Sequence, residues 1–220
     1  MGFTGGMPGV KVLGVLAGND TPIQTVAAWA ASADLVIAAD GAANQLLKAG
    51  ISISAIIGDM DSIDPVVERS NIEFLEDPDQ ETTDCDKLLV HVRDRYPDSS
   101  FALAGIEGDR FDHVLSSIFS VGRILPSTRL ILRDGFGWYV QSESGLDIAT
   151  VPGQLVSLIP LTPCEGVRML GVRWSPSSIL APLGDLSTSN EATGDRVQVT
   201  VKSGAALLIQ QAPSYRVEWL

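Results

Sequence analysis

Two aspartates one residue apart, Asp59 and Asp61, stand in the segment Gly58-Asp59-Met60-Asp61-Ser62. Carboxylates held this close repel each other unless a cation lies between them. Carboxylate oxygens are also ligands that Mg²⁺ takes in proteins. The pair therefore indicates either a metal site or a solvated loop, and the neighbouring residues have to decide between the two.

Three further segments carry polar side chains that could take part in chemistry. They are Asp40-Gly41-Ala42-Ala43-Asn44, Asp79-Gln80-Glu81-Thr82-Thr83-Asp84-Cys85-Asp86-Lys87 and Gly105-Ile106-Glu107-Gly108-Asp109-Arg110-Phe111-Asp112-His113. Asp40 and Asp84 have a simpler explanation as helix caps, a position that Asp often fills. Caps account well for single acids and less well for a concentration of them.

The cationic residues in these segments also allow two interpretations. Arg110 stands near the predicted start of a helix, where a cation is disfavoured, and this indicates that an anion binds there. Lys87 could instead pair with an acid at helical spacing. His113 could be a polar residue on a half-buried helix.

Taken together, the four segments favour magnesium-dependent phosphoryl transfer. In that chemistry carboxylates hold the ion, and cations stabilise the phosphate oxygens. Magnesium prefers one or two carboxylates and keeps several waters, so not all of these acids can be ligands.

The elements that must position these residues alternate between strands and helices from Val10 to about Arg133. This alternation is typical of a parallel sheet covered by helices. Ligands bind beyond the carboxyl ends of such strands, and each polar segment follows a predicted strand. The predicted strands are Lys11–Ala17, Leu35–Ala39, Ala55–Ile57, Ile72–Leu75, Phe101–Ala104 and Leu130–Leu132. The predicted helices are Pro22–Ala31, Ala42–Ala49, one that begins at Thr83 with a capping-box pattern, and Phe111–Leu125.

The second part of the chain reads as antiparallel β-structure, because apolar runs alternate with Gly, Pro, Ser and Asn turns after about Phe136. The predicted fold class is α/β, with a Rossmann-like parallel sheet flanked by helices and then an antiparallel β-sandwich. We expect a flexible tail over residues 1–9, an α/β domain over 10–136 and a β domain over 137–220. The runs that predict strands in the second domain are Leu155–Ile159, Arg168–Val172, Arg196–Val201 and Ala205–Gln210.

Composition excludes several classes of protein. In 220 residues, 45% are hydrophobic and 19% are charged, which indicates a folded globular chain. The formal net charge of −12 makes nucleic acid an improbable partner. An anionic small molecule stays possible, since a metal and a few cations can invert the field inside one cleft.

The cellular setting is predicted from what the sequence lacks. Cys85 and Cys164 have no partner spacing for a zinc site, so both are expected to be reduced thiols. Residues 1–9 have no basic region of the kind that begins a signal peptide. Apolar runs stay short of the roughly 20 residues of a membrane span. We therefore expect a soluble cytoplasmic protein with no membrane partner.

The same segments resemble motifs of the thiamine pyrophosphokinase family. Asp40-Gly41-Ala42-Ala43-Asn44 is similar to the family's Asp-Gly-Gly-Ala-Asn, and Gly58–Ser62 to its Gly-Asp-(Phe/Leu/Met)-Asp-Ser. Asp79-Gln80 with Thr83-Asp84 and Lys87 is similar to Asp-Gln-x-x-Thr-Asp-x-x-Lys, and Gly108–His113 to Gly-Gly-Arg-Phe-Asp-His. In the β region, Gly171–Trp174 and Ser187–Glu191 also resemble family segments.

The resemblance implies an enzyme that uses ATP and magnesium to pyrophosphorylate thiamine. It implies an ATP-binding α/β domain, a thiamine-binding β-sandwich, and a homodimer with thiamine bound between subunits. The implied metal ligands are Asp59, Asp61 and Asp84, and the implied catalytic residues are these three with Lys87 and Arg110. The implied ATP-binding residues are Asp40, Gly41, Gln80, Thr83, Arg110, Asp112 and His113. The implied thiamine-binding residues are Ser187, Ser189 and Asn190.

Three positions depart from the family pattern. Ala42 and Asp109 each stand where the family has glycine, and Asp109 adds a negative charge beside the expected phosphate site. Ile209 stands where some relatives place a tryptophan near the thiamine ring.

The resemblance implies in-line attack of the thiamine hydroxyl on the β-phosphorus of ATP, with AMP as the leaving group. Asp112, Asp84 and His113 are all candidates for the general base, and the sequence does not rank them. Two other functions stay open: a pyrophosphokinase for another hydroxymethyl compound such as a pterin alcohol, and a non-catalytic thiamine- or nucleotide-binding regulator.

Overall fold

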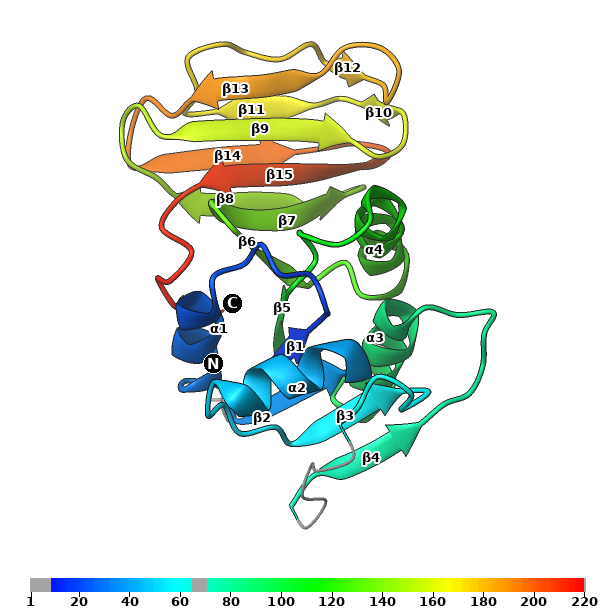
Figure 1. Cartoon of the computed structure of the whole chain (residues 1–220). Coiled ribbons are helices and arrows are strands. Elements are labelled where there is room, and N and C mark those ends of the chain that lie inside the picture. The colour runs from blue at the N-terminus through cyan, green and yellow to red at the C-terminus, as the bar shows by residue number, and fades with distance from the viewer. Residues whose placement is uncertain (1–8, 65–70, 220) are drawn as a thin grey trace, which may run out of the picture. The chain divides into compact units, whose positions relative to one another are not determined.

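The computed structural model describes residues 9–64 and 71–219 (Figure 1). The predicted tail over residues 1–9 therefore falls almost wholly outside the described residues. The chain divides into two compact units, one that reaches to Arg133 and takes up the chain again from Tyr215, and one over Asp134–Ser214. Each unit is described separately below.

The first unit is built on a parallel sheet of six strands in the order β6-β5-β1-β2-β3-β4. The chain moves outward from β1 through β2 and β3 to β4, and then returns to the other side of β1 for β5 and β6. Between β1 and β5 the strand order therefore reverses, which is where open α/β sheets bind ligands. The strands are β1 (Lys11–Val15), β2 (Leu35–Ala39), β3 (Ala55–Gly58), β4 (Glu73–Glu76), β5 (Ser100–Ala104) and β6 (Arg129–Leu132).

The central strands of this sheet are buried on both faces, which explains their uniformly apolar sequences. In β1, β2, β3 and β5 nearly every residue is buried, whereas the edge strand β4 has exposed glutamates at both ends. One large side chain in each inner strand is almost fully inaccessible to water: Leu13, Ile37, Ile56, Leu103 and Leu130.

In the part of this unit that the structure describes, four helices accompany the sheet: α1 (Ile23–Ala30), α2 (Asp40–Lys48), α3 (Asp84–Arg95) and α4 (Phe111–Ile124). Helices α2 and α3 both contact β2 and β3, and α4 contacts α3. The capping box predicted at Thr83 is present, because Thr83 Oγ1 accepts from the backbone N–H of Asp86 and the Asp86 carboxylate accepts from the backbone N–H of Thr83. This pairing satisfies two backbone donors at the start of α3.

Asp86 also joins α3 to α4. Its Oδ1 accepts hydrogen bonds from Ser120 Oγ (2.8 Å) and from Arg123 (2.6 Å), both on α4. Burial raises the pKa of Asp86, but these donors and Thr83 outweigh the effect of burial, so its pKa lies below the ordinary value. The carboxylate is therefore ionised at neutral pH.

The last residues of the chain return to the first unit instead of continuing the second. The Trp219 indole N–H donates to Ser32 Oγ (3.0 Å), and its ring packs edge-on against Trp29 with centroids 5.1 Å apart. A buried aromatic contact of this kind fixes a chain end that would otherwise be loosely held. No change in composition marks this return in the sequence.

The second unit consists of antiparallel strands in the orders β13-β9-β15-β7, β11-β14-β8 and β10-β12. Burial alternates along β9 and β14, so each strand has one face in the core of this unit. The strands are β7 (Gly135–Gln141), β8 (Gly145–Ala149), β9 (Leu155–Pro160), β10 (Cys164–Glu165), β11 (Arg168–Leu170), β12 (Ile179–Leu180), β13 (Ser187–Glu191), β14 (Arg196–Thr200) and β15 (Ala205–Gln211).

The glycines at the expected domain boundary belong to strand β7, not to a turn. A Cβ added to Gly135 would collide with the backbone oxygen of Gln210 on the paired strand β15. Glycine therefore serves close approach of two strands here. The sequence pattern does not distinguish this use of glycine from a linker.

The predicted fold class is confirmed, with a helix-flanked parallel sheet followed by antiparallel strands. Within the described residues, every helix is too short or too polar to cross a membrane.

Candidate active site

Three aspartates, one from the start of α2 and two from the loop after β3, form an acidic cluster at the carboxyl edge of the sheet. One carboxylate oxygen each from Asp40, Asp59 and Asp61 lies within 4.8 Å of the other two. Asp40 is buried, Asp59 is half-buried and Asp61 is exposed. The resemblance implies Asp59, Asp61 and Asp84 as metal ligands. This cluster contains the first two together with Asp40, whereas Asp84 is not a member of it and lines the neighbouring cleft.

The loop after β3 folds around the Asp40 carboxylate. Asp40 is the first residue of α2, and its Oδ atoms accept from the backbone N–H groups of Gly41 (2.6 Å) and Met60 (3.0 Å). A Cβ on Gly58 would lie 2.6 Å from the Asp40 Cγ, and Gly58 has a φ of +148°. Met60 has a φ of 67°, a left-handed conformation uncommon for a residue with a side chain. This strained turn holds Asp59 and Asp61 beside Asp40.

The cluster has an excess of negative charge. Burial first, and then the charge of Asp84, raise the pKa of Asp40 to about 6. Burial also raises the pKa of Asp84, although the charge of Lys87 opposes the rise. Neighbouring carboxylates that resist ionisation in this way are stabilised by a cation, and a set of carboxylate oxygens suits a hard divalent ion. The residues present therefore fit a divalent metal.

In the same cluster, the pKa of Asp59 is lowered instead of raised. Its Oδ1 accepts from the backbone N–H of Asp61 (3.2 Å), and its Oδ2 accepts from Gln80 Nε2 (3.2 Å). The Asp61 N–H and then Gln80 lower the pKa of Asp59. The Asp59 carboxylate is therefore ionised at neutral pH.

In a chelating buffer, Asp40 is expected to stabilise the fold less as pH rises. Its folded pKa of about 6 lies above the ordinary value of 3.8, so the folded state binds the proton more tightly. The stabilisation is complete below the unfolded pKa of about 4 and is lost as pH rises through about 6. Melting temperatures of the wild type and of Asp40→Asn should be compared between about pH 5 and about pH 7.5.

The asparagine variant serves as the control, because every other titrating group is common to both proteins. The wild type should lose melting temperature relative to Asp40→Asn across this range. A difference between the two proteins that stays constant with pH would contradict the raised pKa of Asp40.

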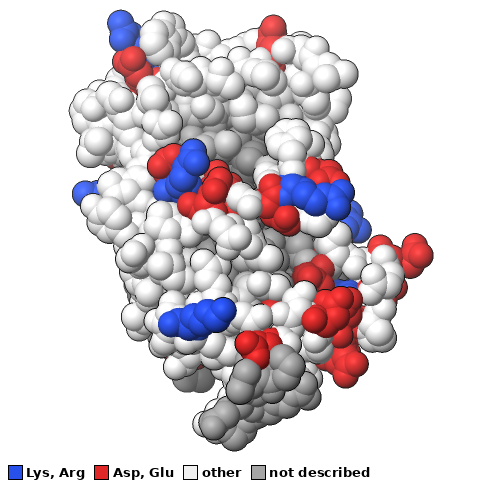
Figure 2. Space-filling view, viewed as in Figure 1, with Lys and Arg blue, Asp and Glu red and all other residues white. Residues whose placement is uncertain are grey.

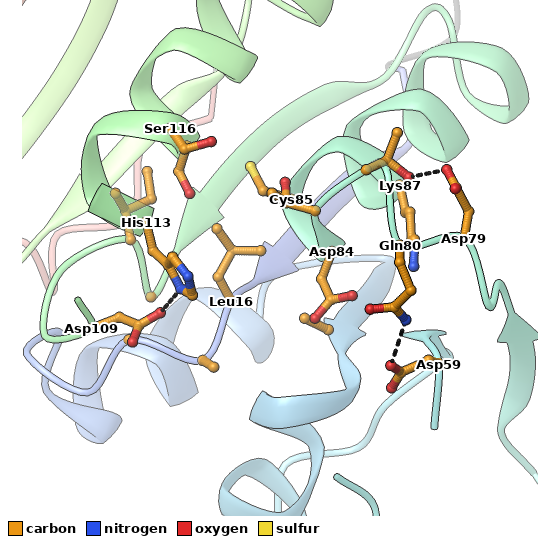
Figure 3. A pocket seen from close by; sticks show the side chains of 18 residues that line it. Leu16, Asp59, Asp79, Gln80, Asp84, Cys85, Lys87, Asp109, His113 and Ser116 are labelled. Atoms are coloured by element: carbon orange, nitrogen blue, oxygen red, sulfur yellow. Dashed lines mark hydrogen bonds and ion pairs between the residues drawn. The ribbon is translucent and has the colours of Figure 1, made fainter. Parts of the chain in front are cut away.

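A cleft of about 260 Å³ opens beside the cluster, in the first unit (Figure 3). Its floor is formed where the loops after β1 and β5 run together. The backbone N–H groups of Leu16 and Gly18 donate to the backbone oxygens of Ala104 and Gly105, both at 2.9 Å. The cleft therefore lies at the reversal of strand order. Its lining residues are Leu16, Ala17, Gly18, Ala39, Asp59, Asp79, Gln80, Thr82, Thr83, Asp84, Cys85, Lys87, Gly105, Ile106, Asp109, His113, Ser116 and Ser117.

The start of α3 supplies one wall of the cleft, with the predicted residues Gln80, Thr83, Asp84 and Lys87. Lys87 is only 7% exposed, and its Nζ donates to the backbone oxygen of Asp77 (2.7 Å). A lysine buried among carboxylates is a fixed positive charge in a cleft that is otherwise acidic. Figure 2 shows the acidic side chains gathered on the side where Figure 1 places α3.

The opposite wall carries His113 and Asp109, from the beginning of α4 and the loop before it (Figure 3). His113 Nδ1 lies 2.7 Å from Asp109 Oδ2. The backbone N–H of Arg110 also donates to Asp109 Oδ1 (2.7 Å), and this contact, followed by that with His113, lowers the pKa of Asp109 despite some burial. The Arg110 N–H and His113 thus stabilise the negative charge that Asp109 places where the family has glycine.

Arg110 and Asp112 are not among the residues that line the cleft. The Arg110 guanidinium makes two contacts with the Asp112 carboxylate, at 2.6 and 3.2 Å, and both side chains are largely exposed. Arg110 is also the N-cap of α4. These contacts use Nε and Nη2 of the guanidinium, and neither involves Nη1.

The predicted thiamine-binding residues lie on β13 in the second unit, at a break in its pairing. The register with β9 shifts between Ser187 and Asn190, and Ser189 has a φ of 53°. Asn190 is 2% exposed, and its amide accepts from the backbone N–H of Trp174 (3.1 Å) and donates to the Trp174 oxygen (2.6 Å). Asn190 therefore ties a neighbouring loop to β13, whereas Ser189 is exposed on the bulge.

Some residues of the site were not predicted as ligands from the sequence. Asp40 was assigned to the nucleotide and not to the metal cluster, and Asp109 was noted only as a departure from a glycine. Cys85 and Ser116 also line the cleft. Asp109 and His113 are four residues apart, and this helical spacing is the signal in the sequence that could have indicated the contact between them.

Comparisons of the chain with known proteins agree across both units. Residues 26–131 match the family model described as "Thiamin pyrophosphokinase, catalytic domain" and residues 142–206 match "Thiamin pyrophosphokinase, vitamin B1 binding domain". "Thiamin pyrophosphokinase 1" of Caenorhabditis elegans is 30% identical over 188 residues, covering 78% of this chain and 76% of that protein.

Solved structures agree with the fold. A thiamin pyrophosphokinase family protein from Enterococcus faecalis has a TM-score of 0.76 at 21% identity, covering 92% of this chain and 99% of the other. The yeast thiamin pyrophosphokinase has a TM-score of 0.76 at 18% identity, covering 96% of this chain and 88% of the other.

Proposed function

The chain belongs to the thiamin pyrophosphokinase family, and on this premise we propose how its own residues transfer pyrophosphate from ATP to thiamine. The reaction joins the thiamine hydroxyl oxygen to the β-phosphorus and breaks the bond between that phosphorus and the oxygen of AMP. The hydroxyl proton leaves to a base, and the products are thiamine diphosphate and AMP. The observation that supports this best is the acidic cluster beside a buried lysine, in a cleft at the reversal of strand order.

The metal that fits the cluster is proposed to be Mg²⁺, held by Asp59 and Asp61 with Asp84 and Asp40 close to them. When bound, it would neutralise charge on the phosphate oxygens of ATP. The four carboxylates exceed what magnesium takes directly, so some of them would act through water. Gln80 keeps Asp59 oriented through its 3.2 Å hydrogen bond.

ATP is proposed to lie in the cleft of the first unit. Lys87 is fixed by Asp77, and its charge would stabilise phosphate oxygens. Arg110 would add a second cation. The complete proposed set of ATP-binding residues is Asp40, Gly41, Gln80, Thr83, Arg110, Asp112 and His113.

Position relative to the cleft supports two of the three candidate bases. Asp84 and His113 line the cleft, whereas Asp112 does not. His113 is oriented by Asp109 through Nδ1, and a base oriented by a carboxylate is a recurrent arrangement in enzymes. Asp84 and His113 are therefore favoured over Asp112.

Thiamine is proposed to bind to the second unit through Ser187 and Ser189, with Asn190 holding the bulge that presents them.

Binding of thiamine between the subunits of a homodimer is part of the same proposal. Helix α4 exposes Phe111, Leu115 and Phe119 at a spacing of four residues, with 75%, 40% and 54% of each exposed. An apolar row on a helix favours cover by another protein surface. A cytoplasmic location is likewise proposed.

The experiment that tests the function uses ATP labelled at the γ-phosphate. It measures the AMP that is released and, separately, the label that is transferred to thiamine. With thiamine and Mg²⁺, we expect AMP and labelled thiamine diphosphate. Transfer of a single phosphoryl group would give ADP instead. Thiamine monophosphate, whose hydroxyl is blocked, is the matched control and should give no AMP.

Two outcomes would favour the alternative functions. AMP formed with a pterin alcohol and not with thiamine would indicate another hydroxymethyl acceptor. Calorimetric binding of thiamine with no AMP at any metal concentration would indicate a regulator without catalysis. The match to both thiamin pyrophosphokinase domains disfavours each of these.

A further inference from the structure

Asp86 is a buried carboxylate next to the cleft but outside its lining. It lies on the first turn of α3 and is 8% exposed. The proposed reaction assigns it no contact with substrate or metal. Its position between the site residues Asp84 and Lys87 nevertheless connects it to both.

The two oxygens of the Asp86 carboxylate accept hydrogen bonds from the start of one helix, α3, and from the side of another, α4. On one side, Oδ2 accepts from Thr83 Oγ1 (2.7 Å) and from the Thr83 backbone N–H (3.2 Å). On the other side, Oδ1 accepts from Ser120 Oγ (2.8 Å) and from Arg123 (2.6 Å). Four donors therefore converge on one side chain, from the start of α3 and from the C-terminal half of α4.

The residues fixed by this arrangement face the cleft. Thr83, Asp84 and Lys87 all line it, and the Lys87 backbone N–H donates to the Thr83 oxygen (3.0 Å) in the same turn. Of the two donors on α4, Ser120 is 4% exposed and belongs to the core, whereas the Arg123 side chain is 69% exposed. A movement of Asp86 would shift this turn relative to the acidic cluster.

We propose that Asp86 is a positioning residue, which locks the first turn of α3 to α4 so that Asp84 and Lys87 are held at the reacting phosphates. This inference rests on the proposed function. Small displacements of catalytic groups are costly, since about 1 Å of misplacement can slow a reaction on the order of a hundredfold. Asp86 thus acts on turnover without touching a reactant.

The test is Asp86→Asn, assayed for AMP release well below its melting temperature. Asparagine has the same size but a single acceptor oxygen, so it cannot receive donors on both sides. We expect kcat to fall about tenfold to a hundredfold with the KM for thiamine nearly unchanged. The Mg²⁺ concentration for half-maximal activity should rise, because Asp84 is displaced.

A matched control separates positioning from loss of stability. Val92 is fully buried two turns further along α3, and Val92→Ala destabilises the same helix without altering its first turn. Its kcat should stay within about twofold of the wild type at a comparable loss of melting temperature. Asp86→Glu keeps a carboxylate with two acceptor oxygens at a capping-box position where Glu is usual, and should restore most of kcat.

Ser120→Ala provides a milder variant if Asp86→Asn does not fold, since it removes one donor on α4 and leaves three. It should lower kcat severalfold in the same direction. Full kcat in folded Asp86→Asn, or an equal loss of kcat in Val92→Ala, would overturn the inference. Absence of AMP from the wild type would instead refute the proposed function, so the two failures are distinguishable.

Discussion

Replacing Asp59 by asparagine is expected to lower kcat on the order of a hundredfold to a thousandfold. Asp59 is the member of the acidic cluster whose pKa is lowered, first by the Asp61 N–H and then by Gln80, so it carries charge over the whole neutral range. Asparagine keeps the shape but has one acceptor oxygen, so it can receive only one of the two hydrogen bonds from the Asp61 N–H and Gln80. The loss therefore reports the missing charge in the metal site together with one lost hydrogen bond.

The measurement is the rate of AMP release as a function of Mg²⁺ concentration. Asp59→Asn should need more Mg²⁺ for half-maximal activity, and high Mg²⁺ should restore part of the rate. Asp98→Asn is the control, because Asp98 is an exposed acid just before β5, at the opposite edge of the sheet. Wild-type turnover of Asp59→Asn at low Mg²⁺ would show that the cluster does not hold the metal.

The parallel sheet could be predicted from the sequence because its signals are local. Apolar runs such as Leu35–Ala39 are long enough to identify a buried strand, and Thr83 with Asp86 forms the capping box that the pattern indicated. The Asp-x-Asp turn also stands directly after its strand. Positions of this kind need only the neighbouring residues to specify their conformation.

The features that were missed depend on residues far apart in the sequence. Gly135 looks like a linker until its approach to Gln210 on β15 is seen. The return of Trp219 to Trp29 joins the last described residue to helix α1. Asp40 resembles an ordinary helix start, and only the fold of the Gly58 loop around it shows that its carboxylate is buried in the cluster. Such contacts are set by topology, and periodicity carries no information on them.

The predicted ATP-binding residues also depend on contacts that the sequence does not reveal. The sequence motif groups Arg110, Asp112 and His113. These residues lie within four positions of one another, so their backbones are close in any fold. The structure separates them by position: His113 lines the cleft with Asp109, whereas Arg110 is paired with Asp112 outside its lining. Side-chain direction around the N-cap of α4 decides this, and residue type alone does not.

Gly58→Ala is expected to remove most activity without changing any ionisable group. The new Cβ would lie 2.6 Å from the Asp40 Cγ and 2.8 Å from its Oδ2, closer than a methyl group can approach. Its φ of +148° is also unfavourable for alanine. Asp40 or the loop must move, and either movement separates Asp59 and Asp61 from Asp40. We expect a loss of about 2–3 kcal/mol in stability and of about a hundredfold in kcat.

The matched control is Gly50→Ala in the same unit. Gly50 also has a positive φ, of 73°, but an added Cβ has no heavy atom within 4 Å. This variant suffers backbone strain of about 1–2 kcal/mol and no collision, so it should melt earlier yet keep its kcat. Thermal unfolding and AMP release measured on both variants separate the two effects. If Gly58→Ala kept wild-type kcat and the same Mg²⁺ dependence, the packing of the β3 loop against Asp40 would not be what assembles the metal site.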